Sequence, residues 1–242
     1  TQFAFVFPGQ GSQAIAMLDG FAGNPVVAQT VAEASDALQF DLGKLIAAGP
    51  KEELDLTTNT QPVMLTAAVA FYRAWLAAGG PVPSVVAGHS LGEYSALVAA
   101  GVIDFKDAVP LVRFRAQAMQ EAVPVGQGTM AVVLGLSDDD VRAACADAAA
   151  ENPALVVEPV NFNAPAQVVI AGHTAAVERA CELAKAKGAK RAMKLPVSAP
   201  FHSSLLKPAS DRLRDYMAGL NFSAPQIALI NNVDVAIVND VA

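Results

Sequence analysis

The sequence predicts an α/β protein in two parts, a larger domain with a mostly parallel sheet and a smaller subdomain inserted into it. Uninterrupted apolar runs, typical of buried parallel strands, and long helical patterns predict the larger domain over residues 1–125 and 198–242. A different order of short strands and helices predicts the subdomain over residues 126–197. The 242 residues, of which 53% are hydrophobic, suffice for a substantial core.

Composition excludes several classes of function. The formal net charge of -7 argues against nucleic acid as a partner. No apolar run approaches the ~20 residues that span a bilayer, and the N-terminus lacks the basic region of a signal peptide, so we expect no membrane association. Cys145 and Cys181 have no metal-ligand spacing, which favours reduced thiols in a cytoplasmic protein without a metal site.

The first elements alternate between strand and helix. Residues 3–7 are a continuous apolar run that predicts a buried strand, and residues 8–13 (PGQGSQ) break it. Residues 26–48 have helical periodicity. Residues 57–62 are interpreted as a turn and cap cluster, with Pro62 in the first turn of a helix that reaches about residue 78.

A strand, a tight turn and a helix follow over residues 85–101. The turn is Gly88-His89-Ser90-Leu91-Gly92, a G-x-S-x-G. This order is typical of the nucleophile elbow of α/β hydrolases, so we expect a hydrolase-like larger domain with Ser90 as nucleophile. The following helix points its N-terminus at Ser90, which favours negative charge there. The alternative is a purely structural turn.

A helix is predicted from about residue 105 to 122, and Arg115 lies on its apolar stripe. A guanidinium that faces apolar neighbours requires a carboxylate partner. That partner is either a ligand's carboxylate or a structural salt bridge, and a third alternative is a side chain that reaches out to solvent.

The inserted subdomain is predicted as βαββαβ, the ferredoxin-like order. Its strands are expected at residues 129–136, 154–161, 167–171 and 191–197, and its helices after Ser137 and over residues 174–187. The second helix and the last strand carry the main basic cluster of an acidic chain, namely Lys185, Lys187, Lys190, Arg191 and Lys194. The cluster is either a solvated face or a docking surface for an acidic partner.

An activated serine needs a base, and the chain has three histidines. His89 is the neighbour of Ser90 and should point elsewhere, and His173 lies at a strand-to-helix turn that should face solvent. His202 lies in a Pro-rich loop where the chain re-enters the larger domain, so elimination selects it as the base. A third, acidic member of a triad has no clear candidate. A helix over residues 205–217 and a strand over residues 226–233 complete the chain, without a closing element.

Three classes of function remain open from the residues alone. A serine esterase explains Ser90 and His202 but not Arg115. A transferase of acyl groups that carry a free carboxylate explains all three residues. A non-catalytic interaction module explains none of them.

Five segments, in this order, resemble the malonyl-CoA:acyl carrier protein transacylase family of bacterial fatty acid synthesis. They are residues 8–13, residues 88–94 (GHSLGEY), Arg115, residues 161–163 (NFN) and residues 201–203 (FHS). The resemblance covers essentially the whole chain. It implies Ser90 and His202 as a catalytic dyad, an oxyanion hole made of the backbone N–H groups of Gln10 and Leu91, and a malonyl carboxylate held by Arg115. It also implies that Gln61 and Asn161 line the site.

The same resemblance implies malonyl-CoA and an acidic acyl carrier protein as partners. Malonyl would pass through an ester on Ser90 in ping-pong transfer, the CoA thioester being a substrate and no cofactor being required. An esterase or thioesterase that hydrolyses acyl thioesters is the alternative. We expect a cytoplasmic monomer. The family continues past the point where this sequence ends, so part of the larger domain is expected to lie outside it.

Overall fold

The computed structural model describes residues 2–197 and 199–238, which form two compact units. Unit 1 comprises Thr1–Gln117 and Tyr216–Ala242, and unit 2 comprises Ala118–Asp215. The parts of the expected domains that fall on residues 1, 198 and 239–242 lie outside the described residues. The expected domain limits, 126 and 197, stay a prediction. Across the described part of the chain, no helix is both long and apolar enough to cross a membrane.

Unit 1 is built on a four-stranded sheet in the order β1-β2-β7-β8. Strands β1 (Ala4–Phe7), β2 (Val85–Gly88) and β7 (Ala228–Ile230) run parallel, and β8 (Ile237–Val238) pairs antiparallel with β7. The prediction of an α/β fold with a mostly parallel sheet is confirmed. The expectation of no closing element is wrong: β8 is too short for a sequence pattern to show, yet it pairs with Leu229 and Ile230.

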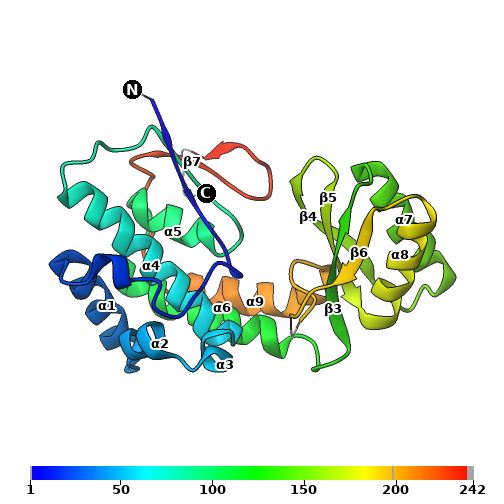
Figure 1. Ribbon diagram of the computed structural model, residues 1–242, viewed down its shortest axis with the longest axis horizontal. Helices are drawn as coiled ribbons and strands as arrows, with labels where there is room; N and C mark the ends of the chain where they lie inside the picture. The colour runs from blue at the N-terminus through cyan, green and yellow to red at the C-terminus, as the bar shows by residue number, and fades with distance from the viewer. Residues whose placement is uncertain (1, 198, 239–242) are drawn as a thin grey trace. The chain divides into compact units, whose positions relative to one another are not determined.

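Helices make up most of the rest of unit 1 (Figure 1). They are η1 (Asp19–Phe21), α1 (Pro25–Leu38), α2 (Leu42–Ala48), α3 (Lys51–Leu54), α4 (Thr57–Ala77), α5 (Gly92–Ala99) and α6 (Phe105–Glu121). The core against the sheet includes Phe7, Tyr72 and Val86, of which Val86 is fully buried.

The expected start of helix α4 at Pro62 is wrong, because the helix begins at Thr57 and contains Pro62. Proline has no N–H for the carbonyl four residues earlier, so a helix normally avoids it beyond the first turn. Here the polar residues taken as a turn bond to the preceding segment instead. The Thr60 hydroxyl donates to the Leu54 carbonyl at 2.6 Å, and Asn59 Nδ2 donates to the Glu53 carbonyl at 2.8 Å.

Unit 2 has the predicted βαββαβ order. Its elements are β3 (Gly128–Leu134), α7 (Asp138–Glu151), β4 (Val157–Ala164), β5 (Gln167–His173), α8 (Thr174–Ala186) and β6 (Arg191–Lys194). The sheet order is β4-β5-β3-β6, with every neighbouring pair antiparallel. Helices α7 and α8 cover one face of this sheet (Figure 1). Their shared core is alanine, valine, leucine, isoleucine and the two cysteines.

Two features of unit 2 refine the prediction. Strand β4 begins three residues later than expected, because a turn over residues 152–155 precedes it, with the N–H of Leu155 bonded to the Asn152 carbonyl at 2.9 Å. After β6 the chain passes through η2 (Ser204–Leu206) into α9 (Lys207–Met217). His202 lies in the turn before η2 with a positive φ of 67°.

Candidate active site

Ser90 stands in a strained turn between β2 and α5, as the sequence predicts. Its φ is 51°, in the left-handed region that non-glycine residues rarely adopt. The turn also needs space: a Cβ atom on Gly92 would lie 2.1 Å from the Phe7 carbonyl oxygen. Glycine is therefore required where α5 begins against β1.

A chain of hydrogen bonds connects Ser90 to the first loop of unit 1. Arg115 Nη2 donates to Ser90 Oγ at 3.2 Å, and Arg115 Nη1 donates to Gln61 Oε1 at 2.7 Å. Gln61 Nε2 donates to Thr57 Oγ1 at 3.2 Å, and the Thr57 hydroxyl donates to Gln10 Oε1 at 2.6 Å. Four of the predicted site residues are thus brought together in unit 1, with Thr57 as a link that sequence reasoning missed.

Arg115 is held in a buried, polar environment. Its exposed fraction is 9%, and that of Gln61 is 2%. The guanidinium lies over the Tyr94 ring, with Cζ 5.4 Å from the ring centroid. Burial raises the pKa of Tyr94, so its hydroxyl stays neutral and can be a polar neighbour of the guanidinium. A buried charge is costly unless it is hydrogen-bonded. The burial of the Arg115 guanidinium therefore indicates a role other than that of a solvated surface cation.

Asn232 contacts both sides of the elbow. Its Oδ1 accepts from the Ser90 N–H at 2.6 Å, and its Nδ2 donates to the Gly88 carbonyl. Its own N–H donates to Glu93 Oε2 at 3.0 Å. Burial raises the pKa of Glu93, an effect that this bond and the charge of Arg115 oppose.

The backbone N–H groups of Gln10 and Leu91 are close to the elbow. A Cβ atom on Gly9 would lie 2.6 Å from the His89 carbonyl oxygen, so the loop that carries Gln10 packs directly on the turn. Leu91 is 1% exposed and precedes the first residue of α5. Within residues 2–197 and 199–238, neither N–H takes part in a hydrogen bond.

The two remaining predicted site residues, His202 and Asn161, belong to unit 2. His202 is exposed, in a turn where the Ser203 hydroxyl donates to the Pro200 carbonyl at 2.8 Å and the Ser204 N–H donates to Glu158 Oε2 at 2.7 Å. Asn161 lies on β4 opposite Val169, beside a bulge. Their pairing with Ser90 stays a prediction. His173 is the N-cap residue of α8 and accepts at Nδ1 from the Val156 N–H at 2.8 Å, so it has a structural use.

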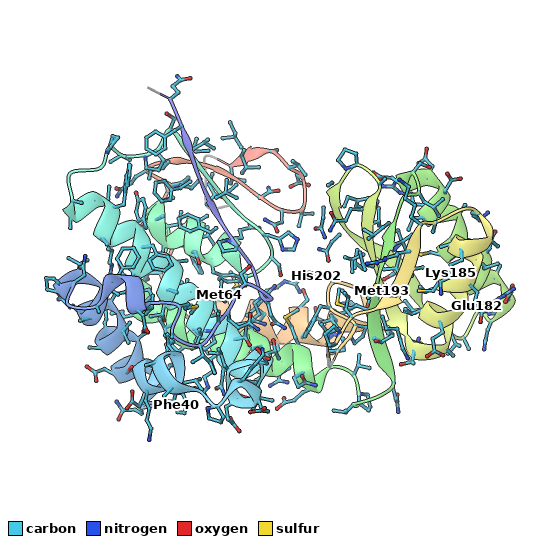
Figure 2. All side chains as sticks on the ribbon, in the orientation of Figure 1. Phe40, Met64, Glu182, Lys185, Met193 and His202 are labelled. Atoms are coloured by element: carbon cyan, nitrogen blue, oxygen red, sulfur yellow. The ribbon has the colours of Figure 1, made fainter. Side chains whose placement is uncertain are left out.

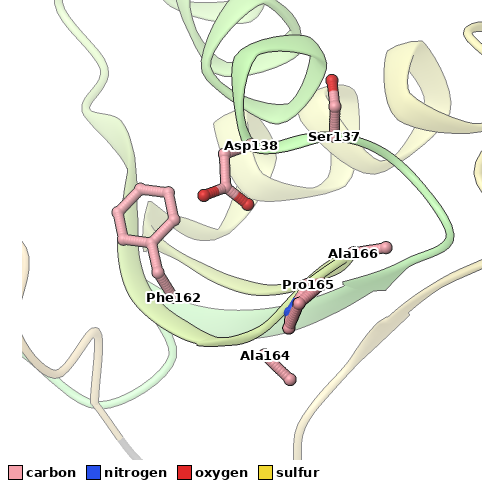
Figure 3. A pocket seen from close by; sticks show the side chains of 6 residues that line it. All are labelled: Ser137, Asp138, Phe162, Ala164, Pro165 and Ala166. Carbon is pink, nitrogen blue, oxygen red and sulfur yellow. The ribbon is translucent and has the colours of Figure 1, made fainter.

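Unit 2 has a pocket of about 520 Å³ at the β4–β5 turn (Figure 3). It is lined by Ser137, Asp138, Phe162, Ala164, Pro165 and Ala166. Arg142 lies over the Phe162 ring, with Cζ 4.4 Å from the centroid. Ser137 is the N-cap residue of α7, and its hydroxyl donates to Asp140 Oδ2 at 2.7 Å, so its polar contacts belong to the start of that helix and we do not count it as a catalytic candidate.

The predicted basic cluster lies on α8 and β6 and the residues between them, where Lys185 and Met193 are labelled in Figure 2. Lys187 Nζ lies 3.2 Å from Asp147 Oδ2, and Lys194 Nζ lies 2.6 Å from Glu178 Oε1. In the described ranges, Lys185, Lys190 and Arg191 have no ion pair and all three are exposed. The cluster therefore has fewer cations without an ion pair than the sequence suggests.

Sequence reasoning missed Thr57 and Asn232. Thr57 lies four residues before Gln61, one helical turn away, but the helix was expected to begin after both. Asn232 comes just after β7, which runs parallel to β2. Since the carboxyl ends of parallel neighbours share an edge, the residues after β7 lie beside the elbow. The order of the strands in the sheet was therefore the one signal that could have identified Asn232.

Comparisons with known proteins agree over nearly the whole chain. The acyl transferase domain family matches residues 4–238. The malonyl CoA-acyl carrier protein transacylase of Escherichia coli K12 is 58% identical over 236 residues, which are 97% of this chain and 75% of that protein. The crystal structure of an acyl-carrier-protein S-malonyltransferase from Burkholderia pseudomallei 1710b is 70% identical with a TM-score of 0.96, covering 99% of this chain and 77% of that one. A malonyl-transacylase in complex with its type II PKS acyl-carrier protein is 54% identical with a TM-score of 0.96, covering 99% and 77%.

Proposed function

Because this chain belongs to the malonyl CoA-acyl carrier protein transacylases, a group within the acyl transferase domain family, we propose that it transfers malonyl from malonyl-CoA to the phosphopantetheine thiol of an acyl carrier protein, in fatty acid synthesis. One observation carries the proposal furthest. A buried guanidinium, that of Arg115, lies within hydrogen-bond distance of the hydroxyl of an elbow serine, Ser90. A cation beside the nucleophile suits an acyl group that carries a second, free carboxylate.

The first half-reaction forms an ester on Ser90. His202 takes the hydroxyl proton while Ser90 Oγ attacks the thioester carbonyl. The tetrahedral oxyanion is held by the backbone N–H groups of Gln10 and Leu91, each of which can contribute ~3 kcal/mol. The C–S bond then breaks, and CoA leaves with the proton from His202. Malonyl-Ser90 remains.

The second half-reaction reverses these steps with a new thiol. The phosphopantetheine thiol gives its proton to His202 and attacks the ester carbonyl. The ester C–O bond breaks, and Ser90 recovers its proton from His202. The CoA thioester is a substrate throughout, so no tightly bound cofactor is needed. In the described residues, no group of three or more His, Cys, Asp and Glu side chains could hold a metal ion.

Arg115 provides the selectivity in this scheme. Its planar fork can bind a carboxylate with two parallel hydrogen bonds, which acetyl and other neutral acyl groups cannot accept. Gln61 already accepts from Nη1 and so fixes the plane of the fork. Asn161 is proposed to line the site from unit 2. We place the reaction in the cytoplasm, where both cysteines would stay reduced, as their free, buried state suggests.

The test separates transfer from hydrolysis, which share the first half-reaction. Brief incubation with malonyl-CoA should add one malonyl group to the intact mass, and peptide mapping should place it on Ser90. The ester should persist in buffer and disappear when pantetheine or holo carrier protein is added. Rapid loss in buffer alone would support a thioesterase instead.

The matched control is Ser90→Ala, which should take up no malonyl. Labelling of the variant, or an adduct on another residue of the wild type, would remove Ser90 as nucleophile. His202→Ala should leave the same peptide unlabelled within the incubation time.

A further inference from the structure

We infer that Asn232 is a positioning residue for the nucleophile, a role that rests on the proposed transfer reaction. Asn232 does not carry a reacting atom. It binds the two peptide groups on either side of the turn, through the Ser90 N–H and the Gly88 carbonyl. By doing so it fixes the backbone from which the Ser90 hydroxyl projects.

A side-chain amide fits this double contact. The Ser90 N–H is a donor and requires an acceptor, while the Gly88 carbonyl is an acceptor and requires a donor. One carboxamide provides both from adjacent atoms. Aspartate keeps the acceptor and loses the donor, and alanine loses both.

The contact lies where the backbone is strained. A non-glycine residue at a φ of 51° is strained and persists only when its surroundings hold it. The Ser90 N–H and the Gly88 C=O both bond to the side chain of Asn232, so a single substitution removes both bonds. The bond also occupies the Ser90 N–H, which leaves the oxyanion to the N–H groups of Gln10 and Leu91.

Asn232 is itself held in place. Its backbone N–H donates to Glu93 Oε2 at 3.0 Å, and Glu93 is in the first turn of α5, the helix that the elbow leads into. The segment after β7 is thereby connected to both the turn and the helix. Among the described residues, the side chain of the neighbouring Asn231 bonds within its own loop instead, to the N–H and carboxylate of Asp234, at 2.7 and 3.2 Å.

The experiment compares Asn232→Ala and Asn232→Asp with Asn231→Ala as the matched control. A misplaced nucleophile slows acylation while leaving substrate affinity intact, so the acylation rate constant of Asn232→Ala should fall about 10- to 100-fold with KM little changed. Asn232→Asp should fall less at low pH, where a protonated carboxyl regains a donor. Asn231→Ala should match the wild type.

A second readout keeps the inference separate from the proposed function. Amide hydrogen exchange of residues 88–91 should be faster in Asn232→Ala than in the wild type and unchanged in Asn231→Ala. If the wild type does not transfer malonyl, the proposed function falls and this exchange measurement alone decides the role of Asn232. Wild-type acylation together with wild-type exchange in Asn232→Ala would overturn the inference, as would equal losses in both asparagine variants.

Discussion

The interiors of the two units bury different chemistry. In unit 1 the helix α4 alone buries five polar side chains, Thr57, Asn59, Thr60, Gln61 and Thr66, and α6 adds Arg115. In unit 2 the core between α7, α8 and the sheet consists of apolar residues and two thiols. A buried polar group is costly unless its hydrogen bonds are satisfied, and in unit 1 several of these groups bond to one another in a chain that ends at Ser90.

This difference separates two kinds of contribution. Part of the polar interior of unit 1 belongs to the proposed site, because Thr57, Gln61 and Arg115 form the chain of hydrogen bonds that ends at Ser90. Unit 2 has an apolar core and carries its basic cluster on the surface of α8 and β6. Variants in the polar interior of unit 1 should therefore change the chemical step and its selectivity, whereas variants on the α8–β6 surface of unit 2 should change recognition of the second substrate.

The largest effect is expected from Arg115→Ala. Malonyl transfer should lose about 2–4 kcal/mol in kcat/KM, or about 30- to 1,000-fold, because a charge-assisted pair in a shielded site is removed. Acetyl transfer should hold or rise. Both are measured as initial rates with each acyl-CoA.

Arg113→Ala is the control for that variant, since Arg113 is on the same helix and lies over the Phe40 ring instead, with Cζ 5.1 Å from the centroid. It should leave the ratio of malonyl to acetyl transfer unchanged. Equal losses of both acyl groups in Arg115→Ala would make Arg115 structural, and the contrast between the units would weaken.

A smaller effect is expected from the double variant Lys190→Glu, Arg191→Glu. It should be specific to one acceptor, the carrier protein. Both cations are exposed, and neither has an ion pair within the described ranges. Transfer to an acidic carrier protein should weaken about tenfold and lose most of its salt dependence, while transfer to free pantetheine should not change.

Lys106→Glu, which reverses an exposed charge in unit 1, is the comparison for this pair and should leave both acceptors unaffected. Parallel losses with carrier protein and pantetheine would show that the α8–β6 surface is not a docking surface.

Two carboxyl groups, one in each unit, have pKa shifts in opposite directions. Their contributions to the free energy of unfolding should therefore change in opposite directions with pH. Burial raises the pKa of Glu93 above its ordinary 4.5, so the folded state holds that proton more tightly and the free energy of unfolding falls as pH rises through this window. Glu93→Gln should therefore be more stable than the wild type at pH 7, with the gain absent near pH 4. Urea unfolding at both pH values measures it.

Glu151, on α7, should behave in the opposite sense. Hydrogen bonds from the Arg179 guanidinium lower the pKa of Glu151 below 4.5, so its ionised form stabilises the folded state above that value, and the contribution disappears as pH falls through the lowered pKa. Glu151→Gln should lose a little stability at pH 7 and none at low pH. The same sign for both variants would contradict the assignment of burial as the dominant cause at Glu93.

The smallest effect is expected at Cys145, whose thiol should not react in the native protein. Burial, with Cys181 and Glu158 nearby, raises the pKa of the Cys145 thiol to about 12, so at pH 8 about one molecule in ten thousand carries the thiolate. Iodoacetamide should leave Cys145 unmodified in the native protein and modify it in urea. Fast native labelling, located by peptide mapping, would mean that the core of unit 2 opens more readily than its packing implies.

Strongly patterned parts of the fold were predictable from the sequence. The elbow, the helix with Arg115 and the βαββαβ order of unit 2 each follow a clear hydrophobic period, and the structure has these elements in the predicted order, with β4 beginning three residues late. Helix α4 was misjudged because its first turn is made of threonine, asparagine and proline, which are typical of turns. Their side chains bond to α3 and the segment after it, a tertiary contact that no local pattern reveals.

The sequence predicted several residues that the structure brings together, and it missed the residues that link and hold them. Ser90 and Arg115 are identified by motif and by a charge on an apolar stripe. Thr57 and Asn232 act through hydrogen bonds to residues 47 and 142 positions away, so only the pairing of β2 with β7 and the full length of α4 place them. Partners so far apart in the sequence cannot be recognised from a local sequence pattern.

The close approach at Gly9 and Gly92 has a consequence for redesign. A side chain at either position would overlap backbone atoms, the His89 carbonyl oxygen or the Phe7 carbonyl oxygen, which cannot rotate away. A combinatorial library aimed at new acyl groups gains nothing from varying these two glycines, since nearly all members would be lost to misfolding before selection. Diversity is better placed on Gln61 and Arg115, which belong to the hydrogen-bond chain at Ser90 and which we propose line the acyl site.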